Sequence, residues 1–196
     1  MPEIQLNGKT IATQTGTNEP VLKNNVVMES GFSIPSDVTF PAGHVIQVVS
    51  ENFEATASRA TTTYLDTFLT KSITSLATNS RFLVMVTSMT GGDDASARVQ
   101  LRRTISGVTF DIDNSDGQDG VTMGSDARLS NVRHGTNFHL SYVDEPLASA
   151  GTSINYLIRL RSAEAKTVYL GQTAFTVPAD GDIKALSSMT IMEIAA

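Results

Sequence analysis

The stretch RFLVMVTSMTGGDDASARVQLRR, residues 81–103, decides the fold. Residues 81–88 are almost entirely apolar, which is typical of a β-strand covered on both faces. In residues 97–103, apolar side chains alternate with arginine and glutamine, as in a strand with one buried face. Between them, GGDDA (91–95) is rich in turn-forming Gly and Asp. The sequence therefore predicts two strands and a tight connection at the middle of the chain.

Similar segments extend outward from this stretch in both directions, and no stretch of ten or more residues shows a convincing helical period. Many of them alternate apolar and polar side chains, and Gly, Asp, Asn, Ser or Pro separates most of them. Eight or nine short strands with regular turn signals predict a sandwich or barrel, and we expect an all-β, jelly-roll β-sandwich. The further strands are expected at residues 44–50, 62–73, 107–113, 136–144, 153–162, 166–177 (with a break at Gly171) and 188–194.

The composition agrees with this fold class. Charged residues make up 17% of the 196 residues, against about 25% in average soluble domains. Thr, Ser, Asn, Gly and Ala take their place, and β-branched residues suit a pleated, half-buried surface. The length fits one domain with an additional arm. We expect an arm over residues 1–37 and a sandwich domain over residues 38–196.

The N-terminal segment begins with a hairpin signal. In IQLNGKTIATQ (4–14), Asn7-Gly8 lies between two short alternating runs and fits the positive φ angles of a type I′ turn. An isolated hairpin is only marginally stable in water, so the segment needs a surface to lie on. Two interpretations stay open: it packs along its own domain, or it reaches a neighbouring subunit. In the second case the expected contact residues are Ile4, Leu6, Lys9, Ile11 and Val21.

Charge and cysteine content argue against several classes of protein. The net charge is −6, and there is no basic run of the kind that binds nucleic-acid phosphates. The absence of cysteine removes disulfides, thiolate nucleophiles and Cys-type zinc sites. The start shows no signal-peptide pattern, and no apolar run approaches the roughly 18 residues of a membrane span. We expect synthesis in the cytoplasm, without nucleic-acid binding or membrane insertion.

An acidic run, DIDNSDGQDG (111–120), is the best candidate for a metal site. Its carboxylates at Asp111, Asp113, Asp116 and Asp119 suggest calcium, but an EF-hand loop needs Gly at its sixth position and Glu at its twelfth. Counted from Asp111, those positions hold Asp116 and Thr122. We therefore expect a solvated loop without a metal, and a looser calcium loop stays as the alternative.

Other motifs give little support for catalysis. GGDDA resembles the GDD triplet of polymerases and the start of a cyclase signature, but both need a different domain around them, so we interpret it as a turn. His44, His134 and His139 lack metal-site spacing, and no nucleophile elbow, Walker loop or dinucleotide fingerprint is present. We expect no enzyme activity and no cofactor. A hydrolase that uses two carboxylates is a remote alternative.

The arginines carry more information than the acids. Arg98, Arg102, Arg159 and Arg161 fall on the polar faces of two expected strands. Such a row is either a solvated sheet face or a face that meets another subunit, since Arg is enriched at interfaces and pairs bidentately with carboxylates. We favour the second interpretation for some of them. The last segment, SSMTIMEIAA (187–196), is an apolar strand that we also interpret as a sign of assembly.

Three segments taken together resemble a known family: FPAGHVIQVVS (40–50), RFLVMVTSMT (81–90) and SSMTIMEIAA (187–196). They are similar to small virion structural proteins, labelled tail fibre or head proteins, of tailed bacteriophages of marine and cyanobacterial hosts. The resemblance covers residues 40–196 loosely and implies a jelly roll of the tumour-necrosis-factor or C1q shape, commonly a homotrimer, without catalytic residues. The acidic run from residue 111 departs from the family pattern.

The resemblance places the last strand centrally in the inner sheet of such a trimer. The interface candidates are then Met189, Ile191, Met192 and Ile194 on that strand, with Arg159 and Arg161. We expect a trimeric decoration or cement protein on the exterior of a phage capsid, with the major capsid protein or another virion protein as partner. The alternative is a fibre tip or adhesin that recognises a host surface glycan through loops 111–131 and 144–152.

Overall fold

The computed structural model describes residues 3–6, 9–13, 21–22, 41–92, 95–112, 123–127, 135–173 and 183–196. The chain divides into two compact units, Met1–Thr39 and Phe40–Ala196. Each unit is described by itself.

The first unit contains a three-stranded antiparallel sheet of β1 (Glu3–Leu6), β2 (Lys9–Thr13) and β3 (Val21–Leu22). Leu6 pairs with Lys9, so two residues, Asn7 and Gly8, connect β1 to β2. This register is that of a two-residue hairpin, as the Asn-Gly signal predicts. The five expected contact residues of the arm lie on these strands, but their side chains are outside the description: Ile4, Leu6, Lys9, Ile11 and Val21.

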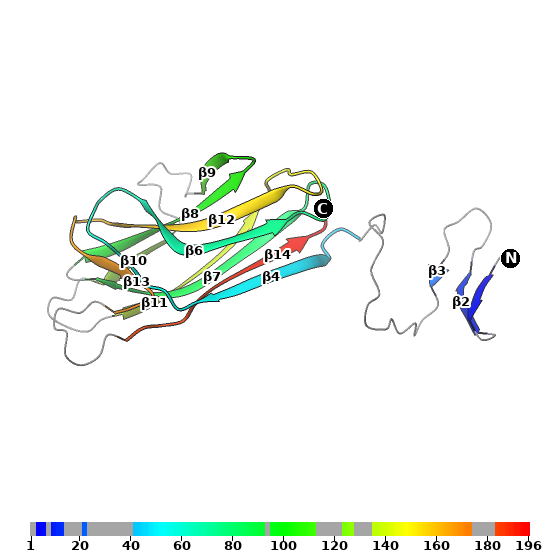
Figure 1. The fold of residues 1–196 in the computed structure, drawn as a ribbon, viewed down its shortest axis with the longest axis horizontal. Coiled ribbons are helices and arrows are strands. Elements are labelled where there is room, and N and C mark those ends of the chain that lie inside the picture. The colour runs from blue at the N-terminus through cyan, green and yellow to red at the C-terminus, as the bar shows by residue number, and fades with distance from the viewer. Residues whose placement is uncertain are drawn as a thin grey trace. The chain divides into compact units, whose positions relative to one another are not determined.

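The second unit is a sandwich of two antiparallel sheets (Figure 1). The first sheet has the order β4 (Val45–Phe53), β14 (Ser187–Ile194), β7 (Arg81–Gly92), β11 (Gly135–Asp144). Two short strands, β5 (Ala57–Arg59) and β13 (Val168–Leu170), extend this sheet beside the end of β7. The second sheet has the order β6 (Leu65–Thr74), β12 (Ser153–Ser162), β8 (Ala95–Ile105), followed along the free edge of β8 by β9 (Val108–Ile112) and β10 (Met123–Ala127).

The strand order identifies the sandwich as a jelly roll. Along the chain, β4, β7, β11 and β14 belong to one sheet, and β6, β8, β9 and β12 belong to the other. The last strand, β14, inserts between β4 and β7. The connection from β7 to β8 is two residues long and passes from one sheet to the other, so these strands do not form a hairpin. The predicted jelly-roll β-sandwich is confirmed.

The core lies between the two sheets and consists of one side of every long strand. Phe82, Val84 and Val86 of β7 belong to one core cluster with the aliphatic side chains of β12, and all are fully buried. Burying a side chain of this size stabilises the folded state by about 1.5–3 kcal/mol. The alternation is confirmed for the inward residues Val99, Leu101, Phe138, Leu140, Tyr156, Ile158 and Leu160, whereas Tyr142, expected on the same face as Phe138 and Leu140, is 37% exposed.

The structure differs from the sequence expectation mainly in the short strands. β5 and β10 were not expected, because three to five residues give too little alternation to recognise. Of the expected strand over 166–177, the structure describes residues 166–173, and residues 174–177 lie outside the description. β13 covers Val168–Leu170 and ends before Gly171, where the break was expected. Gly171 has a φ of +77°, and a Cβ there would lie 2.8 Å from the carbonyl oxygen of Ala55. Only glycine fits this bend, and it ends the strand.

Within the described parts of the chain, the structure contains no helix that is long and apolar enough to span a membrane.

Candidate interaction surfaces

Most of the outer face of the β4–β14–β7–β11 sheet is uncharged and partly apolar, and Arg81 stands opposite Ile194 at the start of β7. Along β14, Met189 and Ile191 point into the core, whereas Met192 and Ile194 point outward and are half-buried. The strand pairings place Met192 in one row with Val48, Leu83 and Val143, so an apolar side chain stands on each of the four strands. Val48 is 53% exposed and Val143 is 47% exposed. This row is open to solvent in the single chain.

Two further rows complete what we call the apolar face. Beside the first row lie Ser50, Thr190, Met85 and Ser141, and beside these lie Asn52, Ser188, Thr87 and His139. Two of the cross-strand contacts are hydrogen bonds, between the hydroxyl oxygens of Ser50 and Thr190 at 2.8 Å and between the hydroxyl oxygen of Thr87 and His139 Nδ1 at 3.0 Å. None of these twelve positions holds Asp, Glu, Lys or Arg.

This placement divides the expected interface residues into two groups. Met189 and Ile191 are fully buried within one sandwich, so they are core residues and present no surface to a partner. Met192 and Ile194 remain on the outer face. The expectation that residues 81–88 are covered on both faces also needs correction: in the single chain Leu83 and Met85 are only half-buried on the outer side.

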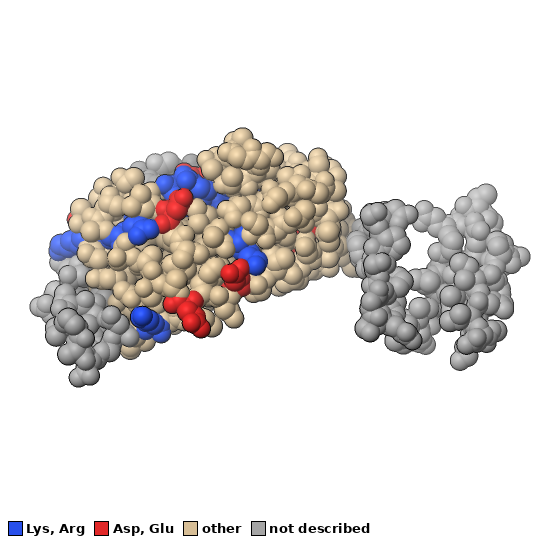
Figure 2. Space-filling model, viewed as in Figure 1, with Lys and Arg blue, Asp and Glu red and all other residues tan. Residues whose placement is uncertain are grey.

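The outer face of the β6–β12–β8–β9 sheet has the opposite character, and we call it the arginine face. It comprises Asp66 on β6, Arg98, Gln100 and Arg102 on β8, Asp111 on β9, and Arg159 and Arg161 on β12, which cross-strand pairings place on one side. Figure 2 shows that charged side chains on the visible side of the sandwich are few and that basic and acidic groups adjoin.

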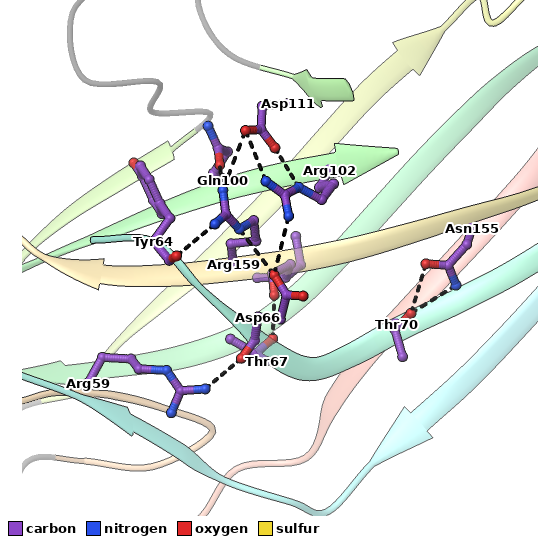
Figure 3. Close-up of polar contacts among 11 residues, drawn as sticks. Arg59, Tyr64, Asp66, Thr67, Thr70, Gln100, Arg102, Asp111, Asn155 and Arg159 are labelled. Carbon is purple, nitrogen blue, oxygen red and sulfur yellow. Dashed lines mark hydrogen bonds and ion pairs between the residues drawn. The ribbon is translucent and has the colours of Figure 1, made fainter. Parts of the chain in front are cut away.

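Four residues of the arginine face form a ring of alternating charge (Figure 3). Arg102 holds Asp111 through two bonds, of 2.6 and 3.1 Å, and its other nitrogen lies 3.7 Å from Asp66. Arg159 donates to Asp66 at 3.1 Å and lies 3.4 Å from Asp111. Arg159 also donates to the Gln100 side chain at 2.8 Å. Arg159, which is one of the expected interface residues, and Arg102 are thus engaged in contacts within one chain.

The ring changes the acidity of its members. The hydrogen bond from Arg102 lowers the pKa of the Asp111 carboxyl, against the opposing effect of burial, and nearby Arg159 lowers it further. The same pairing raises the pKa of Arg102. The lowered pKa favours the ionised form of Asp111, which closes the ring near the end of β9.

Tyr64, immediately before β6, is covered by two guanidinium groups of this face. The Arg161 guanidinium carbon lies 5.1 Å from the centre of the Tyr64 ring, and that of Arg159 lies 5.6 Å from it. Arg159 also donates to the Tyr64 carbonyl oxygen at 2.7 Å. Arg161 is only 8% exposed. The expected interface residues Arg159 and Arg161 therefore lie mostly within the chain's own packing, and only their outer edges face solvent.

Two buried carboxylates connect the sheets at their interior. Asp144 of β11 pairs with Arg103 of β8 and accepts a 2.6 Å bond from the Tyr156 hydroxyl of β12. Burial strongly raises the pKa of Tyr156, and the nearby Asp144 charge raises it further.

Glu193 of β14 is fully buried and accepts hydrogen bonds from the Ser75 hydroxyl and from the backbone N–H groups of Leu76 and Ala77. It thereby fixes the turn between β6 and β7.

The structure places only one of the four calcium candidates. Asp111 is bound by Arg102, while Asp113, Asp116 and Asp119 lie outside the described residues. In the described part of the chain, no group of three or more His, Cys, Asp or Glu side chains is arranged to hold a metal ion. Of the histidines, His139 lies on the outer face as expected, His44 bonds to the Pro41 carbonyl oxygen, and His134 is outside the description.

Sequence reasoning missed the features that need two distant strands. The apolar row joins β4, β14, β7 and β11, whose order follows from the topology and not from any one segment. The sequence analysis treats Glu193 only as part of a terminal strand. An acidic residue in the same alternating set as Met189 and Ile191 could have indicated a buried carboxylate that accepts hydrogen bonds.

Comparison with known proteins defines no family. No protein-family model matches this chain, and no curated protein is similar to it in sequence. Among solved structures, the chain is similar to the VP2 subviral particle of infectious bursal disease virus, with 8% identity, a TM-score of 0.39, and coverage of 93% of this chain and 49% of that one. It is also similar to dimeric latent PorU of Porphyromonas gingivalis, with 10% identity, a TM-score of 0.29, and coverage of 79% and 14%. The chain thus spans about half of the first protein and a seventh of the second.

Proposed function

We propose that this protein is a non-enzymatic structural protein of a tailed-phage virion, a homotrimer that decorates the exterior of the capsid. The particle context comes from the resemblance of residues 40–50, 81–90 and 187–196 to small phage virion proteins. The jelly-roll strand order agrees with the fold that this resemblance implies. The major capsid protein is the partner, and no cofactor is required.

The observation that carries the proposal is the apolar face of the β14 sheet. An apolar row crosses all four strands, and the two rows on its Thr190 side hold no Asp, Glu, Lys or Arg. Depletion of charge with retention of Met is the composition of an interface core. The apolar run in residues 81–88 also has the pattern of a strand covered on both faces, and a partner copy would supply the missing cover. We therefore assign the trimer contact to this face, with Val48, Leu83 and Met192 at its centre.

The N-terminal unit supplies a second means of attachment. Its described strands are only two to five residues long, so they would gain stability by lying on another surface. In a decoration protein that surface is the capsid. Three copies in one trimer would place three such units on one particle, and multivalent contact strengthens binding without strong individual contacts.

A second function, recognition of the host surface from a fibre tip, is favoured by one loop. Leu147, between β11 and β12, is 76% exposed and has a φ of +53°, which is unfavourable for leucine. Neighbouring backbone bonds hold this loop, including Asn79 N–H to Ala148 C=O at 2.8 Å. An exposed apolar side chain on a fixed, strained loop is a feature of binding sites.

The first experiment mixes the purified protein with capsids that lack it and images the particles by electron cryo-microscopy. Density in symmetric copies over the head is expected, with the N-terminal unit against capsid subunits. Bare heads, together with protein bound to tails or host cells, would reject capsid decoration and support host recognition as the function. Light scattering on the free protein tests the trimer separately, because a monomer at all concentrations contradicts the assignment of the apolar face.

A further inference from the structure

The two long sides of the sandwich are finished differently. On one side the edge strands are β4 and β6, and an ion pair of 2.7 Å between Lys71 and Glu51 joins them. On the other side, beside the turn between β8 and β9, the edge strands are β11 in one sheet and β9 in the other. This second side carries apolar side chains that the sandwich leaves exposed.

The inner side of β9 is not covered by the opposite sheet. Its pairing with β8 places Phe110 beside Arg103, which meets Asp144 of β11 inside the sandwich. Phe110 and Val108 therefore belong to the inner side, yet they are 46% and 56% exposed. Tyr142, on the inner side of β11, is exposed as well. We call Val108 and Phe110 the β9 overhang, because they extend past the last strand of the opposite sheet.

The backbone of β11 directs hydrogen-bonding groups to the same side of the molecule. Among the described strands, β11 pairs with β7 alone. The Met89 carbonyl oxygen accepts a bond from Gly171 on the other side of β7, so the even-numbered residues of β7 bond to β11. In an antiparallel ladder the two members of such a pair exchange both bonds. The N–H and C=O groups of His139, Ser141 and Val143 therefore point away from β7, toward the free edge of β11.

This edge lacks the features that usually prevent pairing with a further strand. Natural sheets protect their edges with charged side chains, proline or bulges. The edge strand β6 carries Asp66 and Lys71 and has an irregular register with β12, and β4 carries Glu51 and has an irregular register with β14. Residues 136–143 of β11 contain no Asp, Glu, Lys, Arg or Pro, and their register with β7 is regular. The edge of β11 is therefore suited to strand addition.

We propose that the free edge of β11 accepts one extended strand of a virion partner, whose apolar side chains at alternate positions cover Val108 and Phe110. Only the source of the strand rests on the proposed role in assembly. Main-chain hydrogen bonds to β11 supply affinity, and the β9 overhang supplies selectivity. Because Arg103 beside the Phe110 ring is already paired with Asp144, the overhang favours apolar side chains over acidic ones.

The geometry favours a single strand over a second copy of the sandwich. Two copies joined edge to edge through β11 would bring the second sheet of each copy into the space that β9 of the other occupies, since β8 lies over β11 where Arg103 meets Asp144. A single strand fits beneath the overhang without this collision. It would stand at the rim of the proposed trimer contact, whose centre lies on β4, β14 and β7.

The test begins with a pool of synthetic peptides of about eight residues, a usual strand length. Each peptide has Val, Leu or Phe at every second position, Thr or Ser between, and Lys at both ends. The peptide that the immobilised full chain retains best is then added to the chain in solution, and amide hydrogen exchange is followed by NMR. Exchange at His139, Ser141 and Val143 is expected to slow about tenfold or more.

A second pool with the same composition, but with its apolar residues in one block, is the control and should leave these three amides unchanged. Retention of no alternating peptide above this control pool overturns the proposal. A retained peptide that leaves the three amides unprotected also overturns it.

Two lysine variants test the β9 overhang. Val108→Lys would place an ammonium group against the added strand and is expected to weaken peptide binding more than about tenfold. Thr109→Lys adds the same charge to the neighbouring residue on the opposite side of β9, and its affinity should stay within about twofold of the natural value. Both residues are exposed, so both variants should melt close to the natural chain. Equal binding by the two variants overturns the role of the overhang.

The source of the strand is tested separately from the proposed function. Protection of the same amides in the chain alone, increasing with its concentration, would assign the strand to a second copy and overturn the choice of partner. Capsids decorated as fully by Val108→Lys as by the natural chain would overturn the virion as the source while leaving decoration in place. Peptide binding at β11 together with bare capsids would keep the docking edge and reject capsid decoration.

Discussion

The two outer faces of the sandwich are built by the same alternation and differ completely in chemistry. The apolar face carries Val48, Leu83 and Met192 among hydroxyl groups, and its twelve central positions hold no charge. The arginine face carries a closed ring of two arginines and two aspartates. A jelly roll needs only its inner faces to fold, so the outer faces are free to differ. The proposed assembly accounts for the difference, because it covers the apolar face and leaves the arginine face outside the trimer contact.

The inner sides of the same sheets show the reverse arrangement. The sheet that carries the apolar face directs the carboxylates of Glu193 and Asp144 inward, and the other sheet supplies Arg103 and the Tyr156 hydroxyl that meet Asp144. Each of these two inward carboxylates has several donors, whereas the twelve positions of the apolar face carry no Asp, Glu, Lys or Arg. Four changes test this contrast.

The largest effect is expected from Met192→Asp at the centre of the apolar face. A carboxylate in this row would be buried without a partner on assembly and cost several kcal/mol, so association should weaken more than about a hundredfold. The fold should persist, because Met192 points away from the core. Ser72→Asp, at an exposed position of β6 in the other sheet, is the control and should assemble normally. Analytical ultracentrifugation measures the oligomeric state of both variants. An intact trimer of Met192→Asp would show that the apolar face is not the trimer contact.

The next effect concerns the buried carboxylate of the same sheet. Glu193→Ala leaves the Leu76 and Ala77 N–H groups and the Ser75 hydroxyl without their acceptor. The expected loss in the free energy of unfolding is about 3–5 kcal/mol, measured by urea denaturation. Glu193→Gln keeps one acceptor oxygen and should lose less. Equal stability of Glu193→Ala and the natural chain would contradict the assigned role of this carboxylate.

A smaller effect is expected on the arginine face. Arg159→Met keeps much of the apolar stem of the side chain but removes the donor to Asp66, Gln100 and the Tyr64 carbonyl. The Gln100 side chain is buried, so the loss should reach about 1–3 kcal/mol. Arg159→Lys is the informative control, because it restores the charge but not the planar fork, and it should recover only part of the loss. Full recovery of the free energy of unfolding in Arg159→Lys would show that the planar shape of the guanidinium group is not required at this position.

The smallest effect is the pH dependence of the Asp111 pair. Because the pKa of Asp111 is lowered in the folded chain, its contribution is present above the unfolded value of about 4 and is lost as pH falls through the folded value. Asp111 is partly exposed, so the contribution should stay below about 1 kcal/mol. Asp111→Asn should flatten this part of the stability profile below about pH 4. An unchanged profile would show that the ring does not stabilise the fold.

The sequence predicted most of the fold and little of the surfaces. Long strands with strict alternation, such as residues 97–103 and 153–162, identify their own inward side, so their core residues were correct. In residues 187–194 each of the two alternating sets contains one Met and one Ile, which leaves the inward side ambiguous, and Met189 and Ile191 were accordingly placed with Met192 and Ile194. Neither face could be assembled from one segment, because each joins strands that are distant in the chain.

The central position of β14 has a consequence for folding of the newly synthesised chain. The Ser50 and Thr190 hydroxyls that meet across β4 and β14 are separated by 140 residues in the chain. Until β14 arrives, β4 and β7 have no strand between them, and both present unpaired backbone edges. Pairings over such distances form slowly. The sandwich can therefore be completed only after its last strand has been synthesised. Before that point the newly made chain exposes unpaired strand edges, so its folding competes with aggregation and is favoured by a low local concentration of chains.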